Sequence, residues 1–100
     1  MTNLDELIAT ANELRAPGGC PWDAEQTHQS LTKYLIEESY ELVEAIESGN
    51  REQILEELGD VLYQVIFHSD LAQSGSLGES FNIQDVAALS TKKMKGRHPH

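Results

Sequence analysis

Nine carboxylates lie within residues 37 to 60, and their type and spacing could support metal-ion chemistry. They are Glu37, Glu38, Glu41, Glu44, Glu47, Glu52, Glu56, Glu57 and Asp60, with Arg51 as the one basic residue among them. Acidic residues are common on solvated helix faces, so their number alone indicates no function. A carboxylate on the buried face of a helix is different, because burying its charge costs free energy unless it is paired or bound to metal.

On the first of two predicted long helices, one acid occupies a position where an apolar residue is expected. At about 100° per residue, Glu38 lies inside the apolar arc, three residues after Leu35 and four before Leu42. Glu41 follows one turn later, at the edge of the same arc. The spacing therefore predicts two carboxylates directed towards the interior of a helical bundle.

The second long helix repeats this arrangement. Glu57 lies at the rim of an apolar arc, three residues after Ile54 and four before Val61, and Asp60 follows one turn further on. Four inward carboxylates with few basic partners suit hard cations such as Mg²⁺, which favours carboxylate oxygens, water and substrate phosphates. The alternative is that one or two of these acids reach solvent at the end of the bundle. Three other acids are expected to point elsewhere and to be solvated: Glu44, Glu47 and Glu52.

The elements that position these residues are predicted to be helices. Asn3 is expected to cap the first helix, which ends before the Pro- and Gly-rich segment of residues 15–23, predicted to be an irregular loop. The second helix begins after Asp23 or Thr27 and continues to about Ser48. No strand and no internal repeat is indicated.

A second pair of helices follows. Asn50 is expected to cap a helix from about residue 51 to about 73, and Asn82 caps a shorter one that ends near residue 95, after a break at residues 74–80. Two long antiparallel helices joined by a short turn, with two shorter helices, form a four-helix bundle-like protomer of the all-α class. The third helix is apolar nearly all round, which predicts burial on both sides and hence a second subunit.

The overall composition limits the partners. The formal net charge of −10 argues against a nucleic-acid polymer or an anionic membrane as the main partner. No apolar run approaches the roughly 20 residues of a membrane span. Cys20 is the lone cysteine, which excludes an internal disulfide and fits the cytoplasm. Four of the seven basic residues lie in the last nine positions: Lys92, Lys93, Lys95 and Arg97.

These residues resemble a known family. EESYE at residues 37–41, followed by ELGD at 57–60, is similar to the EExxE…ExxD signature of the MazG-type nucleoside triphosphate pyrophosphohydrolases. GCPWD at 19–23, LGDVLYQVIFH at 58–68 and the basic terminal segment ending in RHPH at 97–100 also resemble MazG sequences. The resemblance extends from about Leu14 onward, and the combination of the acidic motif with GCPWD before it and RHPH after it makes the resemblance specific.

The resemblance implies an activity. The family cleaves nucleoside triphosphates between the α and β phosphates, giving a monophosphate and pyrophosphate, with Mg²⁺ as cofactor, for which Mn²⁺ can substitute. Residues 1–100 would form a single MazG-like domain in a homodimer or homotetramer (a dimer of dimers). The expected substrates are standard or modified deoxynucleoside triphosphates, in a role that cleans the nucleotide pool.

The resemblance also assigns roles to residues. The metal ligands would be Glu38, Glu41, Glu57 and Asp60. Glu37 would bind a further Mg²⁺ or position the attacking water, so that Glu37, Glu38 and Glu41 form the catalytic group. No covalent nucleophile is needed.

Three residues outside the acidic motif could bind substrate. Lys93 and Arg97, one turn apart on the last helix, would hold phosphate oxygens; otherwise they are a solvated basic helix end. Trp22 could stack on the nucleobase or could anchor its loop to the bundle. His28 and His68 are expected to be helix residues with local hydrogen bonds.

Two rival functions follow from the same sequence. One is a non-catalytic helical module that binds metal or a partner, which loss of an inward acid would favour. The other is a related enzyme for other nucleotides, such as a dUTP-specific hydrolase or one acting on phosphoribosyl-nucleotide intermediates. GCPWD and RHPH favour MazG. The segment Glu25–His28 matches the ExxH pattern of di-iron bundles, but that chemistry requires a second copy.

Overall fold

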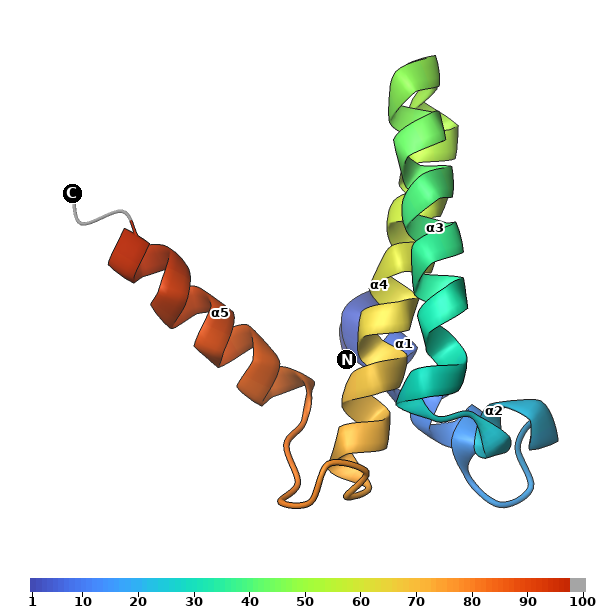
Figure 1. The fold of residues 1–100 in the computed structure, drawn as a ribbon, viewed down its shortest axis with the longest axis vertical. Coiled ribbons are helices and arrows are strands. Elements are labelled where there is room, and N and C mark those ends of the chain that lie inside the picture. The colour runs from blue at the N-terminus through green and yellow to red at the C-terminus, as the bar shows by residue number, and fades with distance from the viewer. Residues whose placement is uncertain (98–100) are drawn as a thin grey trace.

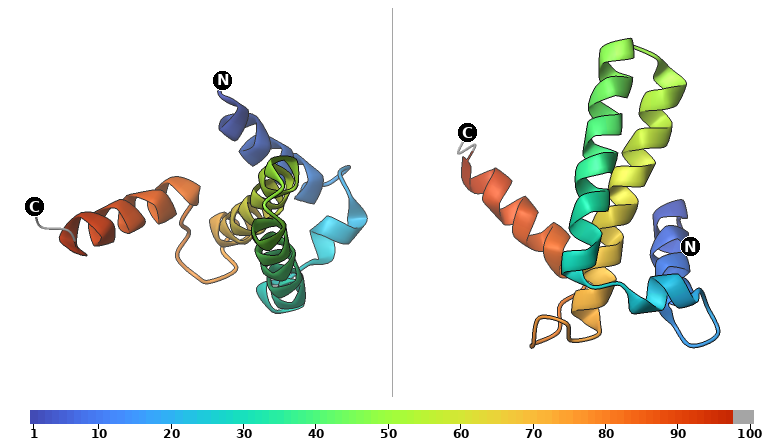
Figure 2. Two further views of the ribbon diagram at one scale, coloured as in Figure 1. Left: turned by 90° about the horizontal axis from the view of Figure 1, so that it is seen from above. Right: turned by 45° about the vertical axis from the view of Figure 1, so that its right-hand side comes forward.

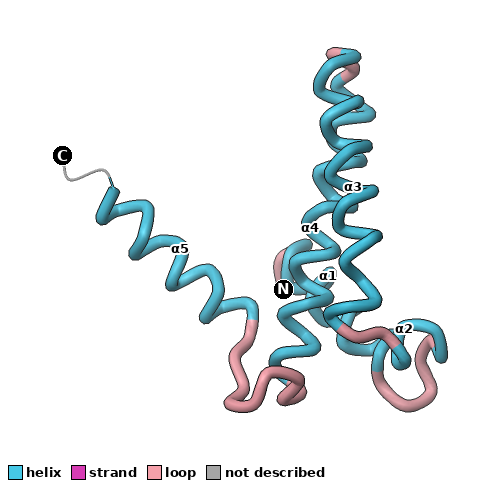
Figure 3. The backbone as a smooth tube through the Cα atoms, in the orientation of Figure 1, coloured by secondary structure: helices cyan, strands magenta, loops and turns pink. Residues whose placement is uncertain are grey.

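The computed structural model describes residues 1–97, and over this part the fold is entirely helical, as predicted (Figures 1 and 3). Residues 98–100, which include the HPH of the terminal motif, lie outside the described residues. The helices are α1 (Asn3–Arg15), α2 (Pro21–Glu25), α3 (His28–Ser48), α4 (Arg51–Gln73) and α5 (Ile83–Arg97). None of the helices over residues 1–97 has the length and apolar character needed to cross a bilayer.

The two long helices, α3 and α4, form an antiparallel hairpin that dominates the molecule (Figure 2). Thr27 caps α3, since its hydroxyl accepts the Ser30 N–H in a reciprocal capping box. Gly49 ends α3 with a φ of 71°, a left-handed conformation that glycine adopts without strain. Asn50 then caps α4 by accepting the Gln53 N–H. These signals turn the chain within two residues and place the two acidic motifs side by side.

The N-terminal segment packs against the lower part of this hairpin and differs in two details from the prediction. Thr2, not Asn3, caps α1, because its hydroxyl forms a capping box with Asp5. The segment predicted to be an irregular loop contains the short helix α2, which begins at Pro21, a residue suited to the first helical position. The preceding Gly19 passes so close to the end of α1 that a Cβ there would collide with backbone carbonyl atoms.

The apolar core is small and lies towards the base of the hairpin. Leu31, Phe67 and Leu71 are almost fully buried, and Tyr34 and Tyr63 pack against them. Tyr63 meets Phe67 edge to face, with ring centroids 6.1 Å apart. Burial raises the pKa of the Tyr63 phenol, and the nearby acids Asp23 and Asp70 raise it further. Above this core, the hairpin of a single chain is only two helices thick.

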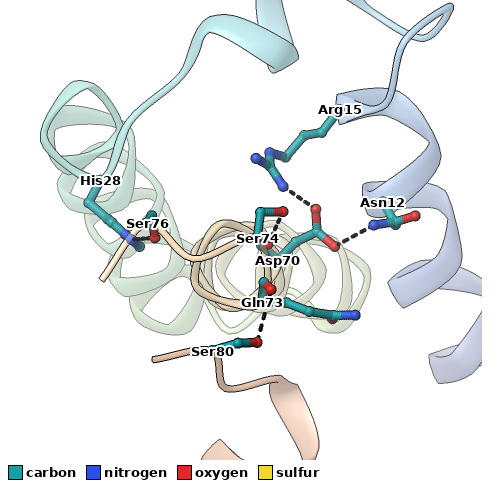
Figure 4. Close-up of polar contacts among 8 residues, drawn as sticks. All are labelled: Asn12, Arg15, His28, Asp70, Gln73, Ser74, Ser76 and Ser80. Carbon is teal, nitrogen blue, oxygen red and sulfur yellow. Dashed lines mark hydrogen bonds and ion pairs between the residues drawn. The ribbon is translucent and has the colours of Figure 1, made fainter. Parts of the chain in front are cut away.

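A buried ion pair connects α1 to the end of α4 (Figure 4). The Arg15 guanidinium donates to Asp70, whose other carboxylate oxygen accepts from the Asn12 amide at 3.0 Å. Asp70 is 6% exposed and the Arg15 side chain 14%. Removing one partner of such a pair typically costs roughly 3–5 kcal/mol, because the other charge remains buried without compensation. This contact therefore fixes the position of α1.

On the other side of α4, two histidines join three segments of the chain. His28 Nδ1 lies 2.7 Å from His68 Nδ1, and the rings stack with centroids 5.0 Å apart. His28 Nε2 lies 2.6 Å from the Ser76 hydroxyl, in the connection to α5 (Figure 4). Burial and the neighbouring His28 both lower the pKa of His68, which favours its neutral form. These hydrogen bonds are long-range in sequence, not local as expected.

The last helix does not complete a bundle with the other three. It leaves the base of the molecule and diverges from the hairpin, so that its end lies far from α3 (Figures 1 and 2). Within residues 1–97, α5 contacts α4 and no other helix, and it has no buried residue. The predicted antiparallel pair of long helices is thus present as α3 and α4, and α1 packs against α4, whereas α5 is an arm and the four-helix bundle-like protomer is not confirmed.

Candidate metal and nucleotide site

Four carboxylates from the two long helices meet at mid-height of the hairpin. Each contributes one oxygen, and these four oxygens all lie within 4.8 Å of one another. The four residues are Glu38, Glu41, Glu57 and Asp60. The reason is geometric: residues three apart on a helix share a face, and the short turn after Ser48 sets the two pairs opposite each other. The structure therefore gathers the same four acids that helical spacing selected.

The cluster is electrostatically unfavourable in the absence of a cation. Burial raises the pKa of Glu38 to about 7, with the charges of Glu41 and Asp60 adding to the effect. Burial likewise raises the pKa of Glu57, followed by the charges of Glu41 and Asp60. Each carboxylate disfavours ionisation of its neighbours. Protonation or a bound cation would relieve this repulsion.

The chemistry of the donor set fits a hard divalent cation. One carboxylate oxygen of Glu38 and one of Glu57 are buried with no hydrogen-bond partner. Within residues 1–97, none of the four acids forms an ion pair with a lysine or arginine. Buried acceptors without donors are rare in native proteins and call for a specific explanation. Carboxylate oxygens are the ligands that Mg²⁺ and Ca²⁺ prefer, so a bound cation would explain these two unpaired oxygens.

A cleft opens beside the cluster. Its volume is about 490 Å³, and it is lined by Glu41, Glu44, Ala45, Gln53 and Glu57. Glu44, which we expected to point elsewhere, therefore borders the site, as does Gln53. The signal for Glu44 was its position one turn after Glu41, whereas Gln53 carried no sequence signal of a role here. The cleft leaves Glu41 and Glu57 accessible from the side of the turn.

Trp22 lies on α2 and packs against α3. Its ring meets Tyr34 edge to face, with centroids 5.6 Å apart, and about half of the side chain remains exposed. Tyr34 precedes Glu38 by one turn on the same face of α3. The indole therefore contacts α3 and remains about half exposed, which leaves both earlier interpretations of Trp22 compatible with its position.

Three other predicted site residues lie outside the cluster in the single chain. Glu37 is exposed on α3 and is rotated by about 100° from Glu38. Lys93 and Arg97 lie on the diverging half of α5, which has no contact with α3. The structure thus brings together the four acids but not the basic residues proposed to hold phosphate.

Comparison with known proteins identifies the family. The profile described as MazG nucleotide pyrophosphohydrolase domain matches residues 26–100, which contain the whole acidic cluster and α5. The chain belongs to the MazG family. Among curated relatives, it is 49% identical to the nucleoside triphosphate pyrophosphohydrolase/pyrophosphatase MazG of Thermotoga maritima. It is 46% and 39% identical to the nucleoside triphosphate pyrophosphohydrolases of Mycolicibacterium smegmatis and Escherichia coli K12.

These MazG relatives are longer proteins. The matches cover 96% of this chain for the Thermotoga and Mycolicibacterium proteins and 100% for the Escherichia protein. The matched part is 36%, 29% and 37% of the respective relatives, so the chain spans about a third of their length. The resemblance in the EExxE…ExxD motif is confirmed at the level of the family.

Proposed function

We propose that this MazG domain hydrolyses nucleoside triphosphates between the α and β phosphates, releasing a nucleoside monophosphate and pyrophosphate. The observation that carries the proposal is the convergence of four carboxylate oxygens within 4.8 Å, two of the side chains having a buried oxygen without a hydrogen-bond donor. The reaction class comes from the relatives, which are named as nucleoside triphosphate pyrophosphohydrolases. Residues 1–100 act as one domain in this proposal.

Glu38, Glu41, Glu57 and Asp60 would hold Mg²⁺, for which Mn²⁺ can substitute. The bound metal supplies Lewis-acid chemistry, neutralising phosphate charge and lowering the pKa of a coordinated water. Glu37, exposed beside the cluster, orients the attacking water for in-line attack on the α-phosphorus. Glu38 and Glu41 complete the catalytic group.

The remaining roles concern substrate recognition. Lys93 and Arg97 bind phosphate oxygens, and the half-exposed Trp22 side chain stacks on the nucleobase. The substrates in this proposal are deoxynucleoside triphosphates, standard or modified, and the role is removal of unwanted nucleotides in the cytoplasm. Neither a nucleic-acid polymer nor a membrane is a partner, since the chain is strongly acidic.

We further propose a homodimer, which could pair into a tetramer. Leu55, Leu58, Leu62 and Val65 are all at least 39% exposed in the single chain and follow one another along one side of α4. Ile36, Tyr40 and Val43 form a second exposed apolar stripe, on α3. A monomer rarely leaves apolar patches of this extent open to water.

The test is a product analysis. The purified protein is incubated with each common NTP and dNTP plus Mg²⁺, and the products are resolved, with Glu38→Gln in parallel. We expect monophosphate and pyrophosphate, and a loss of at least roughly a hundredfold in Glu38→Gln. The matched control is Glu47→Gln, which removes the same charge from the opposite side of α3 and should retain activity.

The other outcomes are equally informative. Diphosphate plus phosphate would show cleavage of the wrong bond and would contradict the proposed chemistry. Binding of Mg²⁺ without turnover of any nucleotide would favour the non-catalytic module.

A further inference from the structure

Two histidines and a serine connect three segments of the chain at the base of the hairpin, and the proposed reaction uses none of them. His28 is the first residue of α3, His68 lies in the last turns of α4, and Ser76 belongs to the connection between α4 and α5. Both histidines are at least two helical turns from the four clustered acids along their own helices. These three residues therefore form a group separate from the candidate metal site.

The two imidazole rings face each other through the same nitrogen. Their Nδ1 atoms are 2.7 Å apart, and the rings are nearly parallel, with an interplanar angle of 15°. This contact is a hydrogen bond only when one proton lies between the two nitrogens, because a ring nitrogen either donates or accepts. A neutral pair with one Nδ1–H meets this condition, and so does a pair with one imidazolium. Two imidazolium rings do not, since both Nδ1 atoms then carry a hydrogen.

The second nitrogen of each ring has a different environment. His28 Nε2 lies 2.6 Å from the Ser76 hydroxyl, which can donate or accept (Figure 4). His68 Nε2 is buried and has no hydrogen-bond partner among residues 1–97. The first added proton is therefore best placed on His28, because both of its N–H groups then have acceptors. A second proton would have to bind His68 Nδ1, where it meets the Nδ1–H of His28.

Among residues 1–97, no acid lines the groove beside the two rings. This groove has a volume of about 350 Å³ and contains, besides the histidines, one serine and apolar side chains from both long helices, the connection and α5. They are Leu35, Val65, Ser69, Leu77, Phe81 and Val86. A second positive charge at the pair would thus be placed next to apolar groups, which disfavours it.

The acids on the neighbouring elements have other positions. Asp70 of α4 pairs with Arg15 on the opposite side of that helix (Figure 4), and Asp85 of α5 accepts the backbone N–H of Asn82. Three further acids, on α2 and on the connection, do not line the groove: Asp23, Glu25 and Glu79. Burial lowers the pKa of His68, and the neighbouring His28 lowers it further.

The pair holds a connection that has few other hydrogen bonds to the helices. The Ser76 N–H donates to the Leu71 carbonyl at 3.2 Å, and the Ser80 hydroxyl donates to the Gln73 carbonyl at 2.9 Å, both at the end of α4. Within residues 1–97, the contact between His28 and Ser76 is the one hydrogen bond that ties the connection to α3. Loss of the histidine pair would therefore free the start of α3 and the connection from each other.

We propose that His28, His68 and Ser76 form an acid-sensitive latch, which holds the start of α3 and the connection to α5 against α4 and opens when both rings are protonated. The ligand that opens it is the hydrogen ion. Because the pKa of His68 lies below its ordinary value of 6.5, the closed latch has its full strength above pH 6.5 and is lost as the pH falls through the lowered value. Opening separates the rings and exposes the apolar groove beside them.

The first experiment follows amide hydrogen exchange by mass spectrometry at pH 7.5 and pH 5, corrected for the intrinsic effect of pH. We expect protection of residues 74–82 and of the first turn of α3 to fall at least about tenfold at the lower pH, because the latch opens locally. His68→Phe keeps a ring in the groove but removes the titrating group, so its protection should not change with pH. It retains the acidic cluster, which also titrates in this range. An equal fall in His68→Phe would overturn the proposal.

Two serine variants test the connection. Ser76→Ala should lower the protection of residues 74–82 at both pH values, while the first turn of α3 still responds to acid. Ser80→Ala is the matched control, since it removes a hydroxyl that bonds to Gln73 and not to the latch. It should retain the response of both segments. A response of residues 74–82 that is the same in Ser76→Ala as in the wild type would show that the latch does not hold the connection.

The second experiment uses the wild-type protein, so it does not depend on the folding of a variant. Isotope-labelled histidine is followed by nuclear magnetic resonance during a pH titration, with signals assigned from the single variants. We expect a scalar coupling between the two Nδ1 atoms at pH 7.5, and two protonation steps separated by more than about one pH unit. Rings that titrate independently near 6.5 without this coupling would contradict the latch. Neither experiment involves a nucleotide, so the latch and the proposed function can be contradicted separately.

Discussion

Ionising the Glu38 carboxyl in the folded protein without a bound cation costs free energy. It lies in the apolar arc of α3, and burial with two nearby acids raises its pKa to about 7. The free carboxyl in the unfolded chain titrates near 4.5. The folded protein therefore binds a proton more tightly than the unfolded chain, and this contribution to stability is complete below pH 4.5 and is lost as the pH rises through about 7.

Replacing this residue should stabilise the protein without metal. In a chelator at pH 8, we expect Glu38→Gln to raise the melting temperature by a few degrees, because it removes a charge that the fold disfavours. At pH 4.5, where the wild-type carboxyl is protonated in the folded state, the difference should vanish. Thermal unfolding followed by circular dichroism at the two pH values measures both effects.

The control and the effect of metal sharpen this prediction. Glu47→Gln, on the solvated side of α3, should show no such pH-dependent gain. Mg²⁺ should raise the melting temperature of the wild type more than that of Glu38→Gln, since a ligand stabilises the state that binds it. A lower melting temperature for Glu38→Gln at pH 8 would contradict the account of an unfavourable charge.

At the scale of elements, local signals predicted most helix boundaries. Thr27, Gly49 and Asn50 occupy the capping positions that their types favour, and Asn82 caps α5 as expected. The short helix α2 was missed because proline and glycine around it indicate a loop, although Pro21 is compatible with a first helical position. The helical period and the short turn were sufficient to predict that the two acids of α3 face the two acids of α4.

Gly19 illustrates an element boundary that depends on close packing. Its backbone N–H donates to the Ala16 carbonyl, and the next N–H, of Cys20, donates to Leu14 at 2.7 Å. A Cβ at residue 19 would overlap with the carbonyls of Glu13 and Leu14. Because these are backbone atoms, Gly19→Ala should destabilise the protein by roughly 1–3 kcal/mol.

Urea unfolding at fixed protein concentration measures this change. Gly96→Ala is the matched control, because a Cβ at that position meets no atom within 4 Å and the residue is helical. It should leave the free energy of unfolding unchanged or raise it by at most about 1 kcal/mol. Equal stability of Gly19→Ala and the wild type would show that the end of α1 can move away.

At the scale of the whole molecule, the periodicity of the sequence cannot predict how the helices are placed relative to one another. The Asn82 cap predicted the existence of α5, but not which surface the helix faces. That direction is set by contacts of individual side chains, such as Ser76 with His28, which are distant in sequence. The same limit applies to Lys93 and Arg97, whose separation from the acids depends on the angle between helices.

The exposed apolar side of α5 gives a test of assembly that leaves the protomer intact. Leu89 is 61% exposed in the single chain and lines an apolar groove of about 500 Å³ along α5. Leu89→Asp should therefore leave the circular dichroism of the protein nearly unchanged. In a dimer that covers this groove, one new carboxylate from each subunit would be buried against apolar groups, which costs about 3 kcal/mol for each and weakens association by at least roughly a hundredfold.

Sedimentation at micromolar concentration decides this prediction. The wild type should sediment as a dimer or larger assembly, and Leu89→Asp should shift towards the 11.1 kDa protomer. Thr91→Asp adds the same charge to an exposed position of α5 outside this groove, and it should leave the assembly unchanged. A wild-type monomer would contradict the dimer itself. A Leu89→Asp variant that assembles like the wild type would show that subunits associate without α5, because a carboxylate cannot remain unpaired in an apolar contact at no cost.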